Sequence, residues 1–212
     1  MAIRIVTDST CDLPQEILLK HGIGVVPLYI HAGGQEYQDG VDLSRREFYE
    51  RLPSYHPAPM TAVPSPEVFR RVYEQMADEG ASEVLSIHIS VKLSAMVDIA
   101  REAAKITAAI PVTVFDSRQL SLGMGFQVLA AAEAAAAGRT MAEILAMLEK
   151  QIARTHVFAA LDTLEFMRRS GRMNFALATL GTLLQIKPLL KMYDGEPAAE
   201  RVRTRGGAIK RL

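Results

Sequence analysis

Short apolar runs alternate, along the first three quarters of the chain, with longer segments whose apolar residues recur at helical spacing. Ile3 to Val6, Val84 to Ile89 and Val112 to Phe115 are β-branched runs of strand length, and helical patterns separate them. Such alternation is typical of βαβ units around a parallel sheet. The pattern therefore predicts a parallel α/β domain over residues 1–154.

The pattern changes at His156, after which the apolar runs are short and two of them flank a turn at Asp194 and Gly195. An Asp-Gly pair between two such runs is typical of a β-hairpin. We predict a second, smaller α/β domain over residues 155–212, and we expect it to be incomplete because residues 208–212 only begin a helical pattern. Its predicted elements are a strand at 157–161, helices at 164–169 and 175–184, and strands at 186–193 and 199–204.

Turn-forming and capping residues predict three local features of the first domain. Asp12 and Pro14 precede a helical pattern, so we expect a helix that Asp12 caps. The run Ile23 to Ile30 predicts one strand. Residues 52–66 contain five prolines and predict a long irregular loop, a feature that is often functional in compact domains.

Small hydroxyl or acidic residues follow each of the three clearest strands: Thr7 to Thr10, then Ser90, then Asp116 with Ser117. The carboxyl ends of parallel strands line one crevice, where open α/β sheets bind ligands. We therefore predict a site at this edge. The residues expected to line it are Asp8, Ser9, Ser117 and the two glycines that follow, Gly123 and Gly125.

The residues near this edge do not form a familiar catalytic set. The chain contains no GxxxxGK[ST], HExxH or GxSxG motif. Gly123 and Gly125 lack the third glycine of a dinucleotide fingerprint, and they predict a backbone in close contact with a neighbour at a helix N-terminus, which favours anions. Cys11, without an adjacent base, is interpreted as a packed thiol rather than a nucleophile. Asp8 is interpreted as a loop-orienting residue rather than a metal ligand.

Composition narrows the class of protein further. The 212 residues are 49% hydrophobic and 23% charged, which is ordinary for a folded domain. Twenty-four basic residues balance twenty-four acidic ones, so net charge gives no support for a nucleic-acid partner or an anionic membrane. We expect no integral membrane segment, no signal peptide and a cytoplasmic protein. The single cysteine excludes an internal disulfide and a cysteine-rich zinc site.

Hydroxyl groups are the chemistry that this chain offers in surplus. Thr61 and Ser65 lie in the proline-rich segment, and Ser94 begins the helical pattern after the second strand. Each of them alone would be a cap or turn residue. A cluster of neutral hydroxyl donors can, however, hold a carboxylate while neighbouring apolar helices enclose an alkyl chain.

These residues resemble the DegV family, whose members include the fatty-acid-binding subunits of bacterial fatty acid kinase. The resemblance covers essentially the whole chain, and its specificity lies in the order and spacing of many short matches. The matching residues are Val6 to Thr10, Asp12 to Pro14, Thr61, Pro64 to Pro66, Lys92 to Ser94, Asp116 with Ser117, Gly123, Gly125, Leu164 with Glu165, Gly171 with Arg172, Ile186 to Pro188, and Arg203 with Thr204.

The resemblance implies a two-domain α/β protein that buries one long-chain fatty acid between its domains. It implies that Thr61 and Ser94 bind the carboxylate, and that Arg172 and Arg203 contact the phosphorylated product or a partner. That partner would be a separate ATP-dependent kinase, so the chain itself would have no catalytic residue, no cofactor and no metal. An alternative for Arg203, with Arg201 and Arg205, is a solvated cationic strand face.

Two departures from the family pattern qualify these implications. Where the family has Thr followed by Ser, this chain has Thr61 followed by Ala62, which removes one hydroxyl. Family members also continue beyond the position of Leu212, so we expect the sequence to be a fragment if the kinase-linked function holds. Fatty acid chain length and unsaturation depend on cavity shape, which the sequence does not reveal.

Two other functions remain as alternatives. One is a phosphate-handling small-molecule transferase that uses Asp8 and the glycine-opened helix. The other is a regulatory binding module for a different amphiphile, with the arginine-bearing strand as its partner surface.

Overall fold

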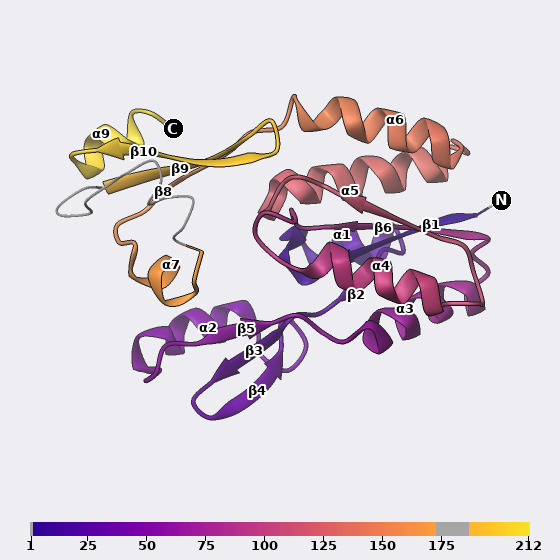
Figure 1. Ribbon diagram of the computed structural model, residues 1–212, viewed down its shortest axis with the longest axis horizontal. Helices are drawn as coiled ribbons and strands as arrows, with labels where there is room; N and C mark the ends of the chain where they lie inside the picture. Colours follow the sequence, from indigo (N-terminus) through magenta and orange to yellow (C-terminus); the bar gives the residue numbers. More distant parts are fainter. Residues whose placement is uncertain (1, 173–186) are drawn as a thin grey trace.

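The computed structural model describes residues 2–172 and 187–212 (Figure 1). Its centre is a four-stranded parallel sheet in the order β2-β1-β6-β7. This confirms the predicted parallel α/β architecture, because the three runs that predict strands form its three adjacent members. The strands are β1 (Ile3–Asp8), β2 (Gly24–Val26), β6 (Glu83–His88) and β7 (Val112–Asp116).

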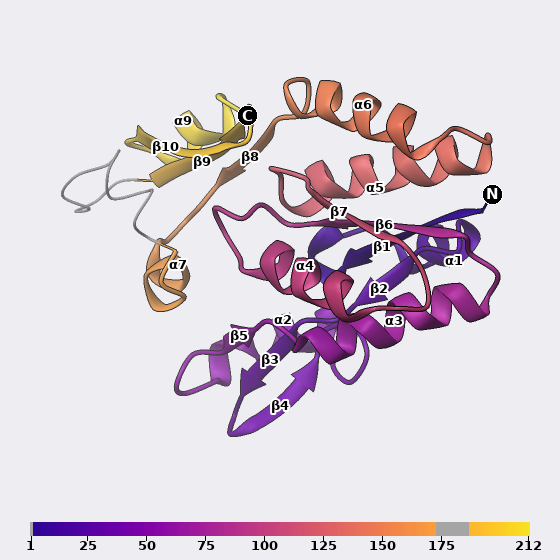
Figure 2. The ribbon, with the colours of Figure 1, turned by 45° about the vertical axis from the view of Figure 1, so that its right-hand side comes forward.

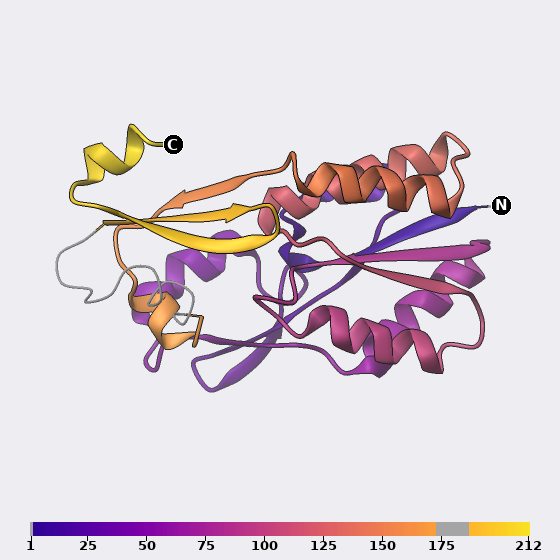
Figure 3. The ribbon, with the colours of Figure 1, turned by 45° about the horizontal axis from the view of Figure 1, so that its top comes forward.

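Helices cover both faces of this sheet, and side-chain alternation along the strands decides which residues meet which helices. α5 (Ser121–Ala136) and α6 (Met141–Ile152) lie on one side and α3 (Pro66–Asp78) and α4 (Met96–Ile106) on the other (Figures 1 and 3). Ile5 packs into the first cluster and its neighbour Val6 into the second. The core is therefore two apolar layers with the sheet between them.

A small antiparallel sheet, ordered β4-β3-β5, extends from the main sheet beside α2 (Arg45–Arg51). The prediction of one strand over residues 23–30 is wrong, because β2 ends at Val26 and β3 belongs to this second sheet. Pro27 stands at the break, where it can donate no ladder hydrogen bond. The strands are β3 (Tyr29–Ala32), β4 (Gln35–Gln38) and β5 (Met60–Ala62).

The proline-rich segment is less irregular than its composition predicts. A 3-10 helix, η2 (Leu52–Ser54), begins it, and β5 pairs with β3 through Ile30 opposite Thr61. β5 can form because it contains no proline: Pro57 and Pro59 precede it and Pro64 follows it.

The predicted cap of the first helix is also wrong. α1 (Gln15–Lys20) begins after Pro14, whereas Asp12 adopts a left-handed conformation with φ 57° and its carboxylate pairs with Arg45. The capping aspartate is Asp8, which accepts from the Thr10 amide in the 3-10 helix η1 (Ser9–Cys11). The cap therefore serves the turn directly after β1 rather than the following helix.

The last part of the chain forms a third sheet, antiparallel in the order β10-β9-β8. The predicted hairpin is confirmed: Asp194 and Gly195 both have positive φ, as a two-residue primed turn requires, and Tyr193 pairs directly with Glu196. This tight turn starts β10 three residues earlier than expected. The elements are β8 (Val157–Ala160), α7 (Glu165–Arg169), β9 (Lys187–Tyr193), β10 (Glu196–Val202) and α9 (Arg205–Ile209).

Two predictions about this part remain without a structural outcome. The helix predicted at 175–184 lies outside the described residues. The domain boundary between residues 154 and 155 stays a prediction, although it falls between α6 and β8.

Substituting Gly125 is expected to destabilise the fold. A Cβ there would lie 2.5 Å from the Cys11 carbonyl oxygen, a backbone atom that cannot rotate away. We expect Gly125→Ala to cost about 1–3 kcal/mol of unfolding free energy, as overpacking typically does. Gly206→Ala in α9 is the control, since no atom lies within 4 Å of that position. Urea denaturation measures both, and equal stabilities would contradict the packing argument.

Candidate functional site

A cleft lies where the carboxyl edge of the parallel sheet meets the last part of the chain. In Figures 1 and 2 this edge faces β3–β5 and α7. A cavity of about 460 Å³ opens there, and Lys92 Nζ and Glu196 Oε1 lie 3.4 Å apart across it. We call it the carboxyl-edge cleft; its lining residues are Lys92, Leu93, Ser170, Gly171, Arg172, Glu196 and Pro197.

Neither Ser94 nor Thr61 belongs to the lining of this cleft, although Ser94 directly follows the lining residue Leu93. Ser94 is half-buried directly after Leu93, and its Oγ accepts from the Met96 amide at 3.4 Å, a long hydrogen bond. Thr61 is exposed on β5, and its hydroxyl has no hydrogen bond within the described residues. Both hydroxyls therefore retain capacity for a ligand.

The two candidate arginines are separated. Arg172 lines the carboxyl-edge cleft and donates from Nη1 to the Ser170 carbonyl at 2.9 Å. Arg203 follows β10 on the exposed surface and is not part of the cleft lining. Neither guanidinium has an ion pair among residues 2–172 and 187–212. Only Arg172 is placed to contact an anion in the cleft.

The other candidate side chains at the strand ends point into protein structure. Ser9 Oγ accepts from the Leu28 amide at 3.2 Å, which fixes the segment between β2 and β3. Ser117 Oγ accepts from the Gln119 amide at 3.1 Å and is fully buried. These hydroxyls hold the turns that surround the cleft.

Gly123 and Gly125 are also in close contact with protein atoms. A Cβ at Gly123 would lie 2.6 Å from Val157 Cγ2 and 2.9 Å from Gln119 Oε1. Gln119 Nε2 in turn donates to the Thr155 carbonyl at 2.9 Å. The first turns of α5 therefore join the parallel-sheet part to the strand β8.

A buried chain of hydrogen bonds, which sequence reasoning missed, runs from α3 to the end of β1. Tyr73 Oη lies 2.9 Å from Ser86 Oγ, which lies 2.6 Å from His88 Nε2. His88 Nδ1 lies 3.0 Å from Asp8 Oδ2. With Asp8 ionised as a pure acceptor, His88 donates from Nδ1, Ser86 donates to Nε2 and Tyr73 donates to Ser86.

Asp8 also accepts from the Ile89 amide at 3.2 Å and from Thr10. Burial opposes its ionisation, but the hydrogen bond and electrostatic interaction with His88, helped by Thr10 and Ile89, outweigh burial and lower the pKa of Asp8. The same burial raises the pKa of Tyr73. Asp8 is therefore a charged anchor that ties the ends of β1 and β6 together.

Ser86, His88 and Asp8 have the order of groups found in hydrolase triads, but not the access that a triad needs. The side chains of all three are fully buried, so Ser86 Oγ cannot meet a substrate. Cys11 is buried too, and this burial raises the pKa of its thiol, as expected of a packed cysteine rather than a nucleophile. These groups contribute to structure.

Acid is expected to remove the stabilisation that Asp8 provides. A carboxyl whose pKa is lower in the folded state stabilises the fold above its unfolded pKa, near 3.8, and that contribution is lost as the pH falls through the lowered value. As the pH falls below about 3.8, the difference in unfolding free energy between wild type and Asp8→Asn should therefore decrease. Urea titrations at a series of pH values measure this difference.

Glu67→Gln is the control for this pH dependence. A hydrogen bond from Arg70 lowers the pKa of Glu67 to about 2, but its side chain is 44% exposed and solvent screens the pair. We expect a smaller difference than for Asp8→Asn. A pH-independent difference between wild type and Asp8→Asn would contradict the assignment.

Within residues 2–172 and 187–212, no group of three His, Cys, Asp or Glu side chains is arranged to hold a metal ion. No helix in the same ranges has the length and apolarity to cross a membrane.

The fold and cleft together define a class: an α/β protein whose parallel sheet presents its carboxyl edge to smaller antiparallel sheets, with a cleft at that edge. A family model described as "Uncharacterised protein, DegV family" matches residues 2–212. The chain is 40% identical over 212 residues to a DegV domain-containing protein of Streptomyces coelicolor, covering 99% of this chain and 74% of that protein. It is 45% identical over 213 residues to one of Deinococcus radiodurans, covering 100% and 75%.

Solved structures agree with this assignment. A DegV family protein from Thermus thermophilus, described as fatty acid binding, superposes with a TM-score of 0.87 at 42% identity, over 99% of this chain and 75% of that chain. DegV, a fatty acid binding protein from Bacillus subtilis, superposes with a TM-score of 0.90 at 32% identity, over 100% and 75%. The protein belongs to the DegV family.

Proposed function

We propose that the protein binds a long-chain fatty acid at the carboxyl-edge cleft. The observation that carries this proposal is the match over nearly the whole chain, at 42% identity, to a fatty-acid-binding DegV protein. A second relative, from Eubacterium ventriosum, is described as binding stearic acid and superposes with a TM-score of 0.88 at 27% identity. A long-chain fatty acid is the ligand class that these relatives support for this protein.

The carboxylate would be held by Thr61 and Ser94, whose hydroxyls retain hydrogen-bonding capacity. Glu196 offsets the charge of Lys92 in the cleft, and Arg172 leaves a net positive charge there, which favours an anionic head group. Hydroxyl donors hydrogen-bond the carboxylate without adding a positive charge directly against it, so its oxygens stay more nucleophilic than in a bidentate pair with arginine. This arrangement suits presentation of a carboxylate rather than its sequestration.

The alkyl chain would cover apolar side chains on the elements that surround the cleft. Each buried methylene contributes about 0.8 kcal/mol, so a long chain can dominate the affinity. Large apolar side chains remain exposed on these elements and are available to an alkyl chain. They are Met60 on β5, Val91 after β6, Phe158 on β8 and Phe166 on α7.

We further propose that the protein is a non-catalytic subunit, which presents the carboxylate to a separate ATP-dependent kinase in the cytoplasm. In that reaction a carboxylate oxygen bonds the γ-phosphorus of ATP while the bond to the ADP oxygen breaks. Arg172, in the cleft, would contact the new phosphate, and Arg203, on the exposed surface, would contact the kinase. The absence of a phosphate-loop motif from the sequence supports the division of labour.

Mass spectrometry of lipid extracted from the purified protein tests the binding step. We expect one fatty acid per chain with a preferred length. Failure to retain added stearate or oleate would overturn the proposal.

The presentation step has a separate test, in which the loaded protein is mixed with ATP and hydroxylamine traps any acyl phosphate. We expect a product only when the kinase is added. ATP hydrolysis by the isolated protein would instead favour the phosphate-handling transferase.

A further inference from the structure

The helix α5 is apolar on nearly all sides, yet it is not fully enclosed. Of its sixteen residues only Ser121, Gln127 and Glu133 carry polar side chains. Helices of this kind are normally buried. One side packs on the sheet, whereas Leu122 and Phe126 on the outer side are 43% and 55% exposed. The outer face of α5 therefore lacks a partner within the described part of the chain.

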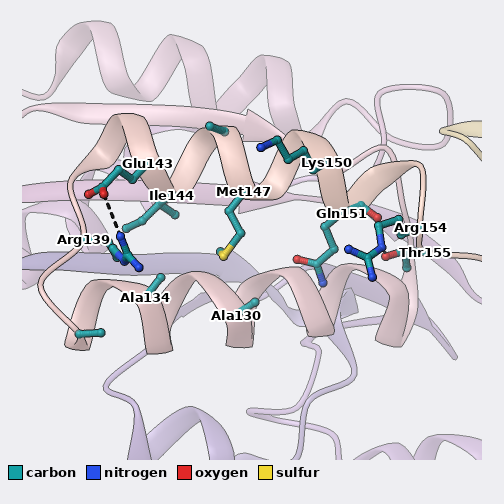
Figure 4. Close-up of a pocket in the computed structure, with 12 residues that line it drawn as sticks. Ala130, Ala134, Arg139, Glu143, Ile144, Met147, Lys150, Gln151, Arg154 and Thr155 are labelled. Atoms are coloured by element: carbon teal, nitrogen blue, oxygen red, sulfur yellow. Dashed lines mark hydrogen bonds and ion pairs between the residues drawn. The ribbon is translucent and has the colours of Figure 1, made fainter.

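A groove runs between α5 and α6 beside this outer face (Figure 4). Its volume is about 820 Å³. The groove is open because the side chains of Ala130 and Ala134 on α5 are small. Met147 and Gln151 extend toward them from α6 (Figure 4). Small residues on one helix allow a further helix to approach closely. The groove thus has room for another helix along α5.

Unpaired charges of both signs flank the groove. Lys150 near the end of α6 and Arg154 just after it have no ion pair among the described residues. Glu133 on α5 is exposed and likewise has no ion pair there. At the other end Arg139 and Glu143 neutralise each other at 3.0 Å. The open charges would pair with an occupant that offers both signs, which a second copy of this chain does.

We propose that this face is a homodimer interface, in which the α5 helices of two copies run antiparallel about a two-fold axis at Ala130. The geometry is self-complementary. Phe126 of one copy then falls level with Ala134 of the other, since both lie four residues from the axis, and large meets small. An isologous two-fold interface requires such reciprocal matching.

The same register pairs the open charges. Thr155 packs beside Gly123, so in this antiparallel helix pair Lys150 and Arg154 lie about level with residues 128 and 124. The two-fold axis places Glu133 of the second copy level with residue 127, between these two cations. Glu133 of each copy is thus placed between two cations of the other, so the interface brings opposite charges together rather than like ones.

The molecular mass in solution tests the interface. We expect light scattering to give twice 23.3 kDa for wild type and 23.3 kDa for Ala130→Arg, which places a cation at the axis. Ala109→Arg, at an exposed alanine before β7, is the control and should stay dimeric. A monomeric wild type at every attainable concentration would overturn the proposal, as would a dimer that Ala130→Arg leaves intact.

Charge reversal and cross-linking test the register and exclude misfolding as the cause. Glu133→Arg alone, and Lys150→Glu with Arg154→Glu, should each give monomers, whereas the triple variant should dimerise again. Ala130→Cys should cross-link under mild oxidation because the two positions meet at the axis, and Ala137→Cys should not. Failure of the triple variant to dimerise, or the reverse cross-linking pattern, would overturn the register.

Discussion

Replacing Thr61 and Ser94 together with alanine is expected to weaken long-chain fatty acid binding by about a hundredfold or more. On the proposed function, each hydroxyl donates to the ionised carboxylate, and such hydrogen bonds contribute about 1.5–3 kcal/mol each. Two of them sum to about 3–6 kcal/mol, and each 1.4 kcal/mol is about a factor of ten in affinity. Displacement of a fluorescent fatty acid measures the change directly.

The matched control removes two hydroxyls from the opposite end of the sheet. Ser82 precedes β6 and Thr107 follows α4, so Ser82→Ala with Thr107→Ala leaves the carboxyl-edge cleft untouched. Its affinity should equal that of wild type.

Ala62→Ser tests the same site in the other direction, because it restores a hydroxyl beside Thr61 and should tighten binding. Unchanged affinity in the Thr61 and Ser94 double variant would refute the assignment of the carboxylate contacts.

The variant Asp8→Ala should lose about 2–6 kcal/mol of unfolding free energy, because at least two buried donors lose their acceptor at about 1–3 kcal/mol each. It leaves His88 Nδ1 and the Ile89 amide without their acceptor inside the core. Thr10 loses both of its hydrogen bonds to the carboxylate. Thermal and urea unfolding should both report the loss.

Asp98→Ala is the control for this stability measurement. Asp98 pairs with Arg101 at 3.1 Å on the surface, where its side chain is 68% exposed. Such pairs contribute about 0–1 kcal/mol, so little change is expected. If the two aspartate variants proved equally stable, the buried chain from Tyr73 to Asp8 would not be the anchor that its geometry indicates.

The parallel sheet could be predicted from the sequence because strands buried on both faces read as continuous apolar runs, and those runs are long here. The break between β2 and β3 could not, since Val25 to Ile30 is apolar on both sides of Pro27. The two strands differ only in the strands they pair with: Val26 of β2 pairs with Asp8 of β1, and Tyr29 of β3 pairs with Gln38 of β4. Short strands such as β5 depend on tertiary pairing more than on their own composition.

For the proposed site, the sequence indicates the edge of the sheet at which the cleft opens but not which way each polar side chain points. Asp8, Ser90 and Ser117 all follow apolar runs, yet all three are fully buried and hydrogen-bonded to neighbouring turns. The chain from Tyr73 through Ser86 to His88 had one visible signal: polar residues inside an otherwise apolar strand and helix face. Such residues need partners, and the partners lie too far apart in sequence to be inferred from it.

Asp8 and Ser9 are neighbours in the chain, and each holds a different arm of the molecule. Asp8 fixes the segment that leads to Ser94 through the Ile89 amide, and Ser9 fixes the segment that leads into β3, the partner of β5, through the Leu28 amide. The two segments that lead to the proposed carboxylate donors, Thr61 and Ser94, are therefore both anchored to the dipeptide Asp8-Ser9 before any ligand arrives. Binding then spends little free energy on ordering the donors, and substitutions at these two buried positions would slow or weaken ligand capture even where the protein still folds.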